Sequence, residues 1–306
     1  MLTCDKYHSP KTLVEALNIL TEASEGSLVI SGATDILPAA REGRKGNVQV
    51  AELIDITGIS DLQSYKIGEN KISLGANIVF QDFLRDKFLQ NNLPCMPPCA
   101  VWFADDQIRE QATLIGNIIN ASPAADGTPS VLVSNGHIER AALIDKEVHL
   151  RSLPVADFIE GPGKTKIRKN EIATKIILDK TPGYGGSFQK VGQRRSLVIS
   201  VACCAALVRL NPLEDKFSDV RISVGGIGPL PSRLYDIEKE LTREKVSTEI
   251  IIKAAQKSAE LVASRTRVNY RKEVIVNFVR AALEEAVDNC ITATHSLSSR
   301  KEELSV

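Results

Sequence analysis

Two glycine-bearing turns carry the residues best suited to bind a ligand. The first, S-G-A-T-D at 31–35, follows the apolar run at 28–30, and the second spans residues 111–127, about eighty positions later. In both turns small residues leave backbone N–H groups accessible, and hydroxyl, amide or carboxylate side chains stand beside them. Because successive N–H groups of this kind bind anions, the pair predicts a phosphate-containing cofactor.

Each turn has both a functional and a structural interpretation. In the first, Gly32 permits close approach of a ligand and Thr34 can donate its hydroxyl to a phosphate, but Thr34 or Asp35 can equally cap a helix. The second surrounds Gly116 with the polar side chains of Thr113, Asn117, Ser122 and Asp126, of which the last can accept from a ribose hydroxyl. It is also rich in turn formers, so taken alone it is equally compatible with an irregular loop.

The rest of the sequence offers no catalytic set. The four histidines stand outside metal-binding and triad-like spacings, and the patterns G-x-S-x-G, H-E-x-x-H and G-x-G-x-x-G do not occur at the expected places. A nucleotide-hydrolase phosphate loop ending at 163–165 would need glycine where Phe158 stands. The pair Cys95 and Cys99 lacks further ligands at metal-binding spacing. We therefore expect no catalytic side chain, no metal site, and chemistry supplied by a cofactor.

The composition is that of a globular protein with a full core. The 306 residues are 43% hydrophobic and 25% charged, and a chain of this length predicts two domains. The 38 basic and 38 acidic residues balance, which argues against a nucleic-acid or polybasic membrane partner. No apolar run is long enough for a membrane span, and the N-terminus lacks a secretion pattern, so we expect a cytoplasmic location.

Short strands and helices alternate around the two turns. The hydrophobic pattern predicts helices over 10–24 and 79–89 and strands over 28–30, 71–76, 131–133, 141–144, 148–150 and 171–178, with a strand and a turn over 48–59. The three prolines within 91–99 argue against a helix interior there. After a glycine-rich boundary at 181–187 we expect a long strand from 188 onward, a strand over 219–228, helices over 249–263 and 270–288, and a frayed polar end.

The two turns, at this separation, resemble those of the flavin-binding subunit of the molybdenum hydroxylases, which include xanthine dehydrogenases and aerobic carbon monoxide dehydrogenases. The family turn A-G-G-T-D-L is matched by S-G-A-T-D-I at 31–36. The family segment I-R-N-x-A-T-x-G-G-N-I-x-x-A-S-P-x-A-D is matched by I-R-E-Q-A-T-L-I-G-N-I-I-N-A-S-P-A-A-D at 108–126. The likeness continues in order through 161–165, 188–195, 220–233 and 269–273, and so covers nearly the whole chain.

The resemblance implies an α+β fold with two domains. A two-lobed FAD-binding domain of the vanillyl-alcohol-oxidase type would span 1–178, with its lobes joined near residue 60. A C-terminal domain of a three-stranded sheet with helices would span 186–290, followed by a polar tail at 291–306.

The resemblance also implies that FAD bridges the two turns. The first would hold the pyrophosphate, the second would flank it and the flavin, and Lys190 would close over the cofactor. The implied contacts are Ser31, Gly32, Ala33, Thr34, Asp35 and Ile36 in the first turn, Thr113, Ile115, Gly116, Asn117, Ser122 and Asp126 in the second, and Lys190.

By the same resemblance, the chain works in a complex. A large subunit would hold the molybdenum cofactor, a small subunit would hold two [2Fe–2S] clusters, and this chain would pass electrons through FAD to NAD⁺ or another acceptor. Two alternatives remain: a self-contained flavin oxidoreductase of the same superfold, such as an enolpyruvyl-sugar reductase, and a non-catalytic assembly subunit with weakened FAD binding.

Three residues depart from the family pattern. Ala33 replaces a glycine, which costs about 1 kcal/mol if the position needs positive φ. Ile115 also replaces a glycine, and a β-branched residue at positive φ is an outlier, so either the backbone there is ordinary or the loop has shifted. Glu110 stands where the family often has asparagine, and its charge is unfavourable if it faces a pyrophosphate.

Overall fold

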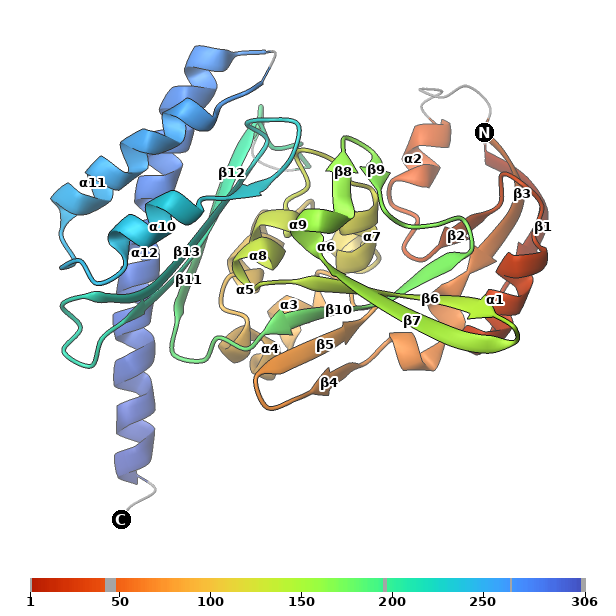
Figure 1. The fold of residues 1–306 in the computed structure, drawn as a ribbon, viewed down its shortest axis with the longest axis horizontal. Helices are drawn as coiled ribbons and strands as arrows, with labels where there is room; N and C mark the ends of the chain where they lie inside the picture. The colour runs from red at the N-terminus through yellow and green to blue at the C-terminus, as the bar shows by residue number, and fades with distance from the viewer. Residues whose placement is uncertain (1, 42–47, 195–196, 265, 304–306) are drawn as a thin grey trace. The chain divides into compact units, whose positions relative to one another are not determined.

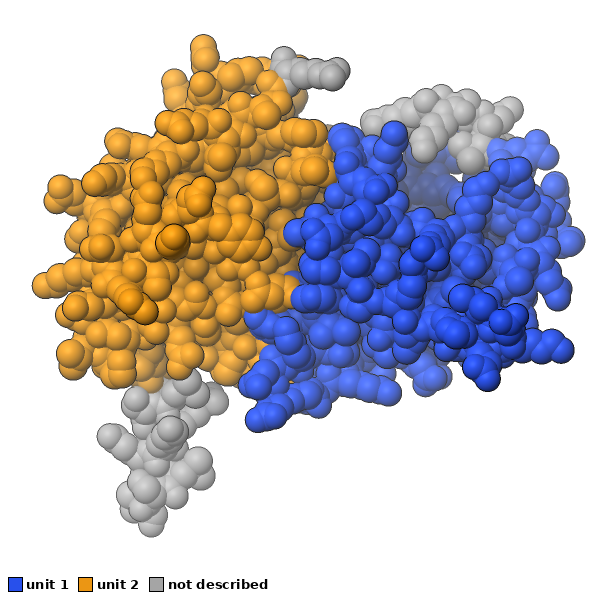
Figure 2. All heavy atoms as spheres, viewed as in Figure 1, with its two compact units in different colours: residues 1–82, 105–121, 136–179 blue, residues 83–104, 122–135, 180–306 orange. Residues whose placement is uncertain are grey.

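The computed structural model describes residues 2–41, 48–194, 197–264 and 266–303, which fall into two compact units (Figures 1 and 2). Unit 1 comprises 1–82, 105–121 and 136–179, and unit 2 comprises 83–104, 122–135 and 180–306. Arg195, the last residue of the family-like segment 188–195, and the end of the predicted tail lie outside the described residues. Two stretches of the predicted first domain thus belong to the unit that contains the C-terminal half, and the predicted domain bounds stay a prediction.

Unit 1 contains a parallel and an antiparallel sheet. In spatial order, the parallel sheet consists of β1 (Leu2–His8), β3 (Val48–Asp55) and β2 (Leu28–Ile30). The antiparallel sheet, again in spatial order, consists of β4 (Tyr65–Ile67), β5 (Lys71–Gly75), β10 (Glu171–Asp179), β6 (His137–Ile144) and β7 (Glu147–Pro154). The strands predicted over 28–30, 71–76, 141–144, 148–150 and 171–178 are confirmed.

Short helices connect these strands. Helix α1 (Leu13–Glu22) begins where Thr12 Oγ1 accepts from the Glu15 N–H at 3.1 Å, as expected of a threonine cap. The other connecting elements of unit 1 are α2 (Ile36–Arg41), η1 (Ile56–Gly58), η2 (Ser60–Leu62), α6 (Asp106–Arg109), α7 (Leu114–Ile119), α9 (Val155–Phe158), β8 (Ile159–Gly161) and β9 (Lys164–Thr165). Helices α2 and α7 matter most, because each begins in one of the glycine turns.

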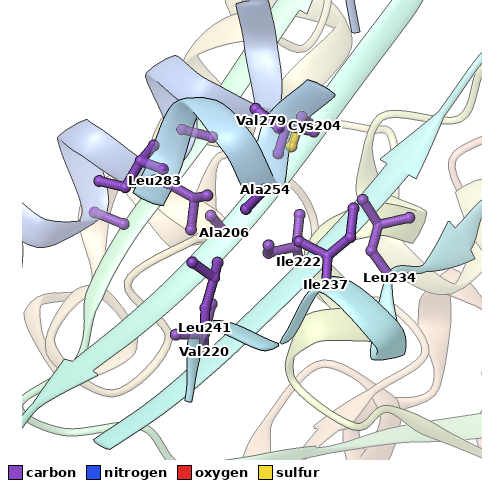
Figure 3. Packing of buried hydrophobic residues seen from close by; sticks show 14 of the residues in the cluster. Cys204, Ala206, Val220, Ile222, Leu234, Ile237, Leu241, Ala254, Val279 and Leu283 are labelled. Carbon is purple, nitrogen blue, oxygen red and sulfur yellow. The ribbon is translucent and has the colours of Figure 1, made fainter. Parts of the chain in front are cut away.

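Unit 2 is built on a four-stranded antiparallel sheet. Its order is β11 (Gly185–Val191), β12 (Ala202–Leu210), β13 (Phe217–Gly225) and β14 (Ser232–Arg233), the last only two residues long. Helices α10 (Tyr235–Leu241), α11 (Thr248–Gln256), the 3₁₀ helix η3 (Lys257–Leu261) and α12 (Val268–Glu303) lie on one face (Figure 1). Their buried side chains form one core with Cys204 and Ala206 of β12 (Figure 3).

The opposite face of this sheet is covered by helices as well. Helices α5 (Met96–Trp102) and α8 (Gly127–Val133) contact β11, β12 and β13. At Gly225 an added Cβ would lie 2.9 Å from Cys203 Sγ and 3.2 Å from Pro129 Cγ, so strand and helix approach closely. The α+β class is confirmed, and this sheet carries helices on both of its faces.

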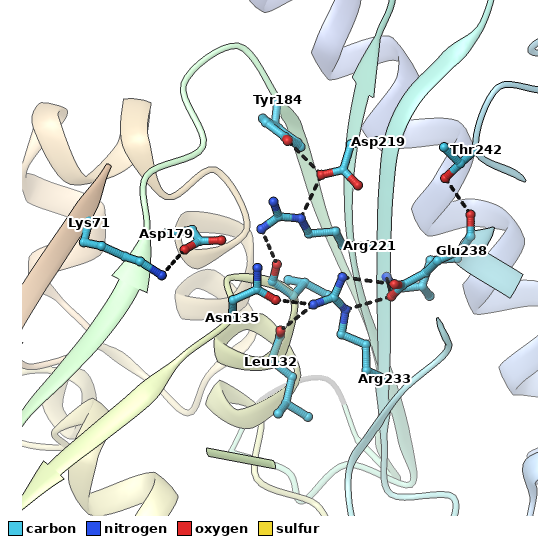
Figure 4. Close-up of polar contacts among 12 residues, drawn as sticks. Lys71, Leu132, Asn135, Asp179, Tyr184, Asp219, Arg221, Arg233, Glu238 and Thr242 are labelled. Atoms are coloured by element: carbon cyan, nitrogen blue, oxygen red, sulfur yellow. Dashed lines mark hydrogen bonds and ion pairs between the residues drawn. The ribbon is translucent and has the colours of Figure 1, made fainter. Parts of the chain in front are cut away.

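Helix α8 replaces the strand predicted over 131–133. Its last carbonyls are held by arginines from the sheet: Arg233 Nη1 donates to the Leu132 carbonyl at 3.4 Å and Arg221 Nη1 to the Val133 carbonyl at 3.3 Å (Figure 4). Arg233 is fixed by Glu238, with Nε–Oε1 at 2.8 Å and Nη2–Oε2 at 3.0 Å. Because the end of a helix leaves carbonyls without intrahelical partners, these contacts stabilise a helix in a strand-like sequence.

Three further predictions are wrong for local reasons. The helix over 79–89 is interrupted at Asp86, which caps α4 (Lys87–Asn92) after the short α3 (Asp82–Arg85). The prediction that 91–99 is not a helix interior holds, since Pro97 and Pro98 lie in the first turn of α5, which needs no N–H donor. The strand expected from 188 is divided into β11 and β12 by the stretch 192–201. The C-terminal end continues α12 through Glu303 instead of fraying.

Candidate functional site

The two glycine turns meet in unit 1. A Cβ added to Gly32 would lie 1.8 Å from the carbonyl oxygen of Gln111 and 2.6 Å from its carbonyl carbon. No side chain can occupy that space, since real Cβ atoms essentially never approach other heavy atoms within 3.0 Å. Only glycine therefore allows the first turn to lie directly against the backbone of the second.

The first turn presents backbone donors. It leads into α2, where the N–H groups of Leu37 and Ala39 donate to the carbonyls of Ala33 and Asp35 at 3.2 Å. In the part of the chain that the structure describes, the N–H groups of 32–36 have no such partner. The stretch therefore offers consecutive donors of the kind that bind a phosphate oxygen.

Ala33 occupies the left-handed region at φ 54°. Alanine there costs about 1–2 kcal/mol relative to the right-handed region, while glycine adopts both freely. We predict that Ala33→Gly raises the free energy of unfolding by about 0.5–1 kcal/mol, because the loss of strain exceeds the greater freedom of glycine in the unfolded chain. Urea unfolding measures the change, and a decrease in stability would contradict the strain at this residue.

Thr113 shapes the second turn. It precedes α7 in an extended conformation, and its Oγ1 accepts from the Gly116 N–H at 3.1 Å. Thr113 thus caps α7, and its hydroxyl hydrogen stays available for another acceptor. Gly116 is exposed, and Asn117 is half-buried one position further along the helix.

Ile115 lies in α7 with an ordinary helical backbone and a side chain only 3% exposed. The first of the two possibilities for this departure is therefore confirmed. Because the side chain packs in the core, we predict that Ile115→Val lowers the free energy of unfolding by about 1 kcal/mol and leaves FAD affinity unchanged. Calorimetric unfolding and FAD titration measure the two effects, and a changed affinity with unchanged stability would place the side chain at the ligand instead.

Glu110, the third departure from the family pattern, is exposed at the end of α6.

Asp126 and Lys190 form a buried ion pair within unit 2. Lys190 Nζ lies 2.6 Å from Asp126 Oδ2 and donates to the Trp102 carbonyl at 3.1 Å, and Ser200 Oγ donates to Asp126 Oδ1 at 2.6 Å. The lysine side chain is 1% exposed and the aspartate side chain 7%. Burial raises the pKa of the Asp126 carboxyl, and the neighbouring ammonium opposes that rise. The structure thus shows an internal ion pair for both residues, and the ribose contact and the closure over the cofactor expected for them stay predictions.

Ser122 also has a local partner, since its Oγ accepts from the Ala124 N–H at 3.2 Å, and its cofactor contact stays a prediction. Sequence reasoning does not find Gln111 or Ser200. Ser200 stands 74 residues from Asp126, and nothing in its local sequence indicates that contact. The glycine at position 32 indicates that another segment approaches closely there, but the sequence does not show that this segment contains Gln111.

The described residues contain no group of three or more His, Cys, Asp or Glu side chains placed to hold a metal ion. All six cysteines are free thiols, and burial raises the pKa of Cys95 to about 12. Among the same residues, no helix combines the length and the apolar character needed to cross a membrane.

Two known families account for most of the sequence. Residues 3–180 match the FAD binding domain in molybdopterin dehydrogenase, and residues 187–286 match the CO dehydrogenase flavoprotein C-terminal domain. The chain belongs to the FAD subunits of the molybdenum hydroxylase family. It is therefore an FAD-dependent oxidoreductase subunit, and FAD is its cofactor.

Individual relatives span nearly the same length. The chain is 25% identical over 290 residues to the xanthine dehydrogenase FAD-binding subunit of Escherichia coli O157:H7, covering 94% of this chain and 96% of the relative. It is 23% identical to the carbon monoxide dehydrogenase medium chain of Hydrogenophaga pseudoflava, covering 93% and 98%. A solved carbon monoxide dehydrogenase from that organism superposes with a TM-score of 0.86 at 22% identity, covering 95% and 99%, which shows a shared fold.

The residues of unit 1 fit this cofactor. Gly32 lets the first turn lie directly against the Gln111 backbone, and the N–H groups of 32–36 suit the diphosphate of FAD.

Proposed function

We propose that this chain is the electron-transfer subunit of a molybdenum-dependent hydroxylase or dehydrogenase. It would receive electrons from [2Fe–2S] clusters of a partner subunit and deliver them through FAD to NAD⁺ or another acceptor. The observation that carries the proposal is the family match over both parts of the chain, joined to the consecutive backbone N–H donors of 32–36 in the first turn. The relatives' names support it, since "medium chain" and "FAD-binding subunit" denote parts of larger assemblies.

The proposed contacts in unit 1 follow from the geometry. The N–H groups of 32–36 bind the diphosphate, with the Thr34 hydroxyl as an additional donor. The free hydroxyl hydrogen of Thr113 and the side chain of Asn117 lie on the adjoining second turn and orient the cofactor. The Asp35 side chain is exposed beside these donors, and we assign its carboxylate no direct contact because its charge would repel a phosphate.

The protein's own contribution is positioning. Bound FAD supplies the redox chemistry, because a flavin takes up electrons singly and releases them as a pair. The described turns hold it by backbone groups whose direction is set by Gly32 and by the cap at Thr113. No side chain of this chain needs to act as an acid or a base.

The proposed partners are a large subunit with the molybdenum cofactor and a small subunit with two [2Fe–2S] clusters, in the cytoplasm. Substrate oxidation then takes place in the large subunit. The relatives are named for substrates as different as xanthine, glyceraldehyde and carbon monoxide, and we assign this complex no substrate.

Co-expression of the chain with the products of its neighbouring genes tests the proposal. We expect one flavin per chain, seen as absorption at ~450 nm, together with iron and molybdenum in the co-purified chains. Anaerobic addition of NADH should bleach this band in the complex if NAD⁺ is the acceptor. A colourless chain would favour the assembly subunit, and oxidation of a small substrate by the chain alone would favour the self-contained flavin enzyme.

A further inference from the structure

Asn77 lies in the segment that follows β5, and its side chain forms a hydrogen bond with the first glycine turn. Its Oδ1 accepts from Ser31 Oγ at 2.8 Å, and its Nδ2 donates to the Ile56 carbonyl at 2.8 Å. Its backbone N–H donates to the Leu62 carbonyl, also at 2.8 Å. The bonds to the Ile56 and Leu62 carbonyls therefore fix the position of Asn77 while it accepts from Ser31.

The residues after Asn77 pair with the start of the second turn. The Phe80 N–H donates to the Ala112 carbonyl at 3.0 Å, and the Leu114 N–H donates to the Ile78 carbonyl at 3.1 Å. One short segment thus contacts the first turn through a side chain and the second turn through its backbone.

We propose that Asn77 is a positioning residue of the cofactor site. It fixes Ser31, so that the N–H groups of 32–36 keep their direction toward the diphosphate. The inference rests on the proposed function, because it needs the diphosphate to lie at the first turn. The Ser31 hydroxyl hydrogen is used in this bond, so Ser31 acts by holding the turn and not by donating to FAD.

Titration of the flavin-free, full-length chain with FAD tests the role of Asn77. We expect Asn77→Ala and Ser31→Ala each to raise the Kd of FAD about tenfold, the upper range for one hydrogen bond. The double variant should raise it little further, because both substitutions remove the same bond. Ser31→Thr keeps the hydroxyl and should restore the affinity.

Gln63→Ala is the matched control. Gln63 Nε2 donates to the Thr57 carbonyl at 2.7 Å, so the control removes an amide-to-carbonyl bond of the same kind outside both turns. It should leave the Kd unchanged. If Asn77→Ala behaves like this control, or only lowers the melting temperature of the flavin-free chain, the inference is overturned. Additive effects of Asn77→Ala and Ser31→Ala would overturn it as well.

Gly32→Ala separates this failure from failure of the proposed site. If Gly32→Ala loses FAD while Asn77→Ala binds it normally, only the role of Asn77 is rejected. If both variants bind FAD as tightly as the unaltered chain, the diphosphate does not lie at the first turn and the site itself is rejected.

Discussion

Gly32→Ala yields a colourless protein. The added methyl group would lie 1.8 Å from the Gln111 carbonyl oxygen, so the two turns must separate by more than 1 Å. Both contact partners are backbone atoms, which cannot rotate away as a side chain would. We expect a loss of about 3 kcal/mol in the free energy of unfolding, at the upper end for overpacking. FAD binding is lost because the donors of 32–36 move with the turn.

Flavin content after purification and urea unfolding measure these effects. Gly68→Ala is the control, since its added Cβ would lie 3.3 Å from the Lys71 carbonyl oxygen and needs only a slight adjustment. That variant should keep its flavin. A yellow Gly32→Ala protein with normal stability would show that the turns are not packed as described.

Lys190→Met destabilises the protein by about 3–5 kcal/mol, because it leaves the Asp126 carboxylate buried without its counter-charge. The remaining carboxyl has a pKa raised by burial, so the folded state binds a proton more readily than the unfolded state. The stability deficit is therefore largest at neutral pH and shrinks as the pH falls toward that raised pKa. Denaturant unfolding at several pH values measures both the loss in free energy of unfolding and its dependence on pH.

Two further variants isolate the charge effect. The double variant Asp126→Asn, Lys190→Met removes both charges and should recover most of the lost stability. Lys257→Met removes a lysine from an exposed pair with Glu240 and should cost at most about 1 kcal/mol. If Lys190→Met lowers the free energy of unfolding no more than Lys257→Met does, the buried ion pair is contradicted.

The elements that the sequence predicts well are those set by local pattern. The 3.6-residue spacing around Ala16 and Leu17 predicts α1, and the run of branched residues in 171–178 predicts β10. The glycine at position 32 likewise predicts a close approach. The family-like motifs extend this to FAD and to the α+β class.

The errors come from contacts distant in sequence. The stretch 131–133 has strand-forming residues, but Arg221 and Arg233 hold its carbonyls as a helix end (Figure 4). The buried contacts of Lys190 with Asp126 and the Trp102 carbonyl are likewise not visible in the sequence around it. The sequence does not single out Asn77, because its contact with the first turn is a hydrogen bond to Ser31, which lies 46 residues away.

A crystal structure of the chain with FAD bound tests the central claim most directly. We expect diphosphate oxygens within about 2.7–3.2 Å of backbone nitrogens among residues 32–36, with Gly32 still against Gln111. A diphosphate bound elsewhere, with these N–H groups facing only solvent, would contradict the proposed cofactor site.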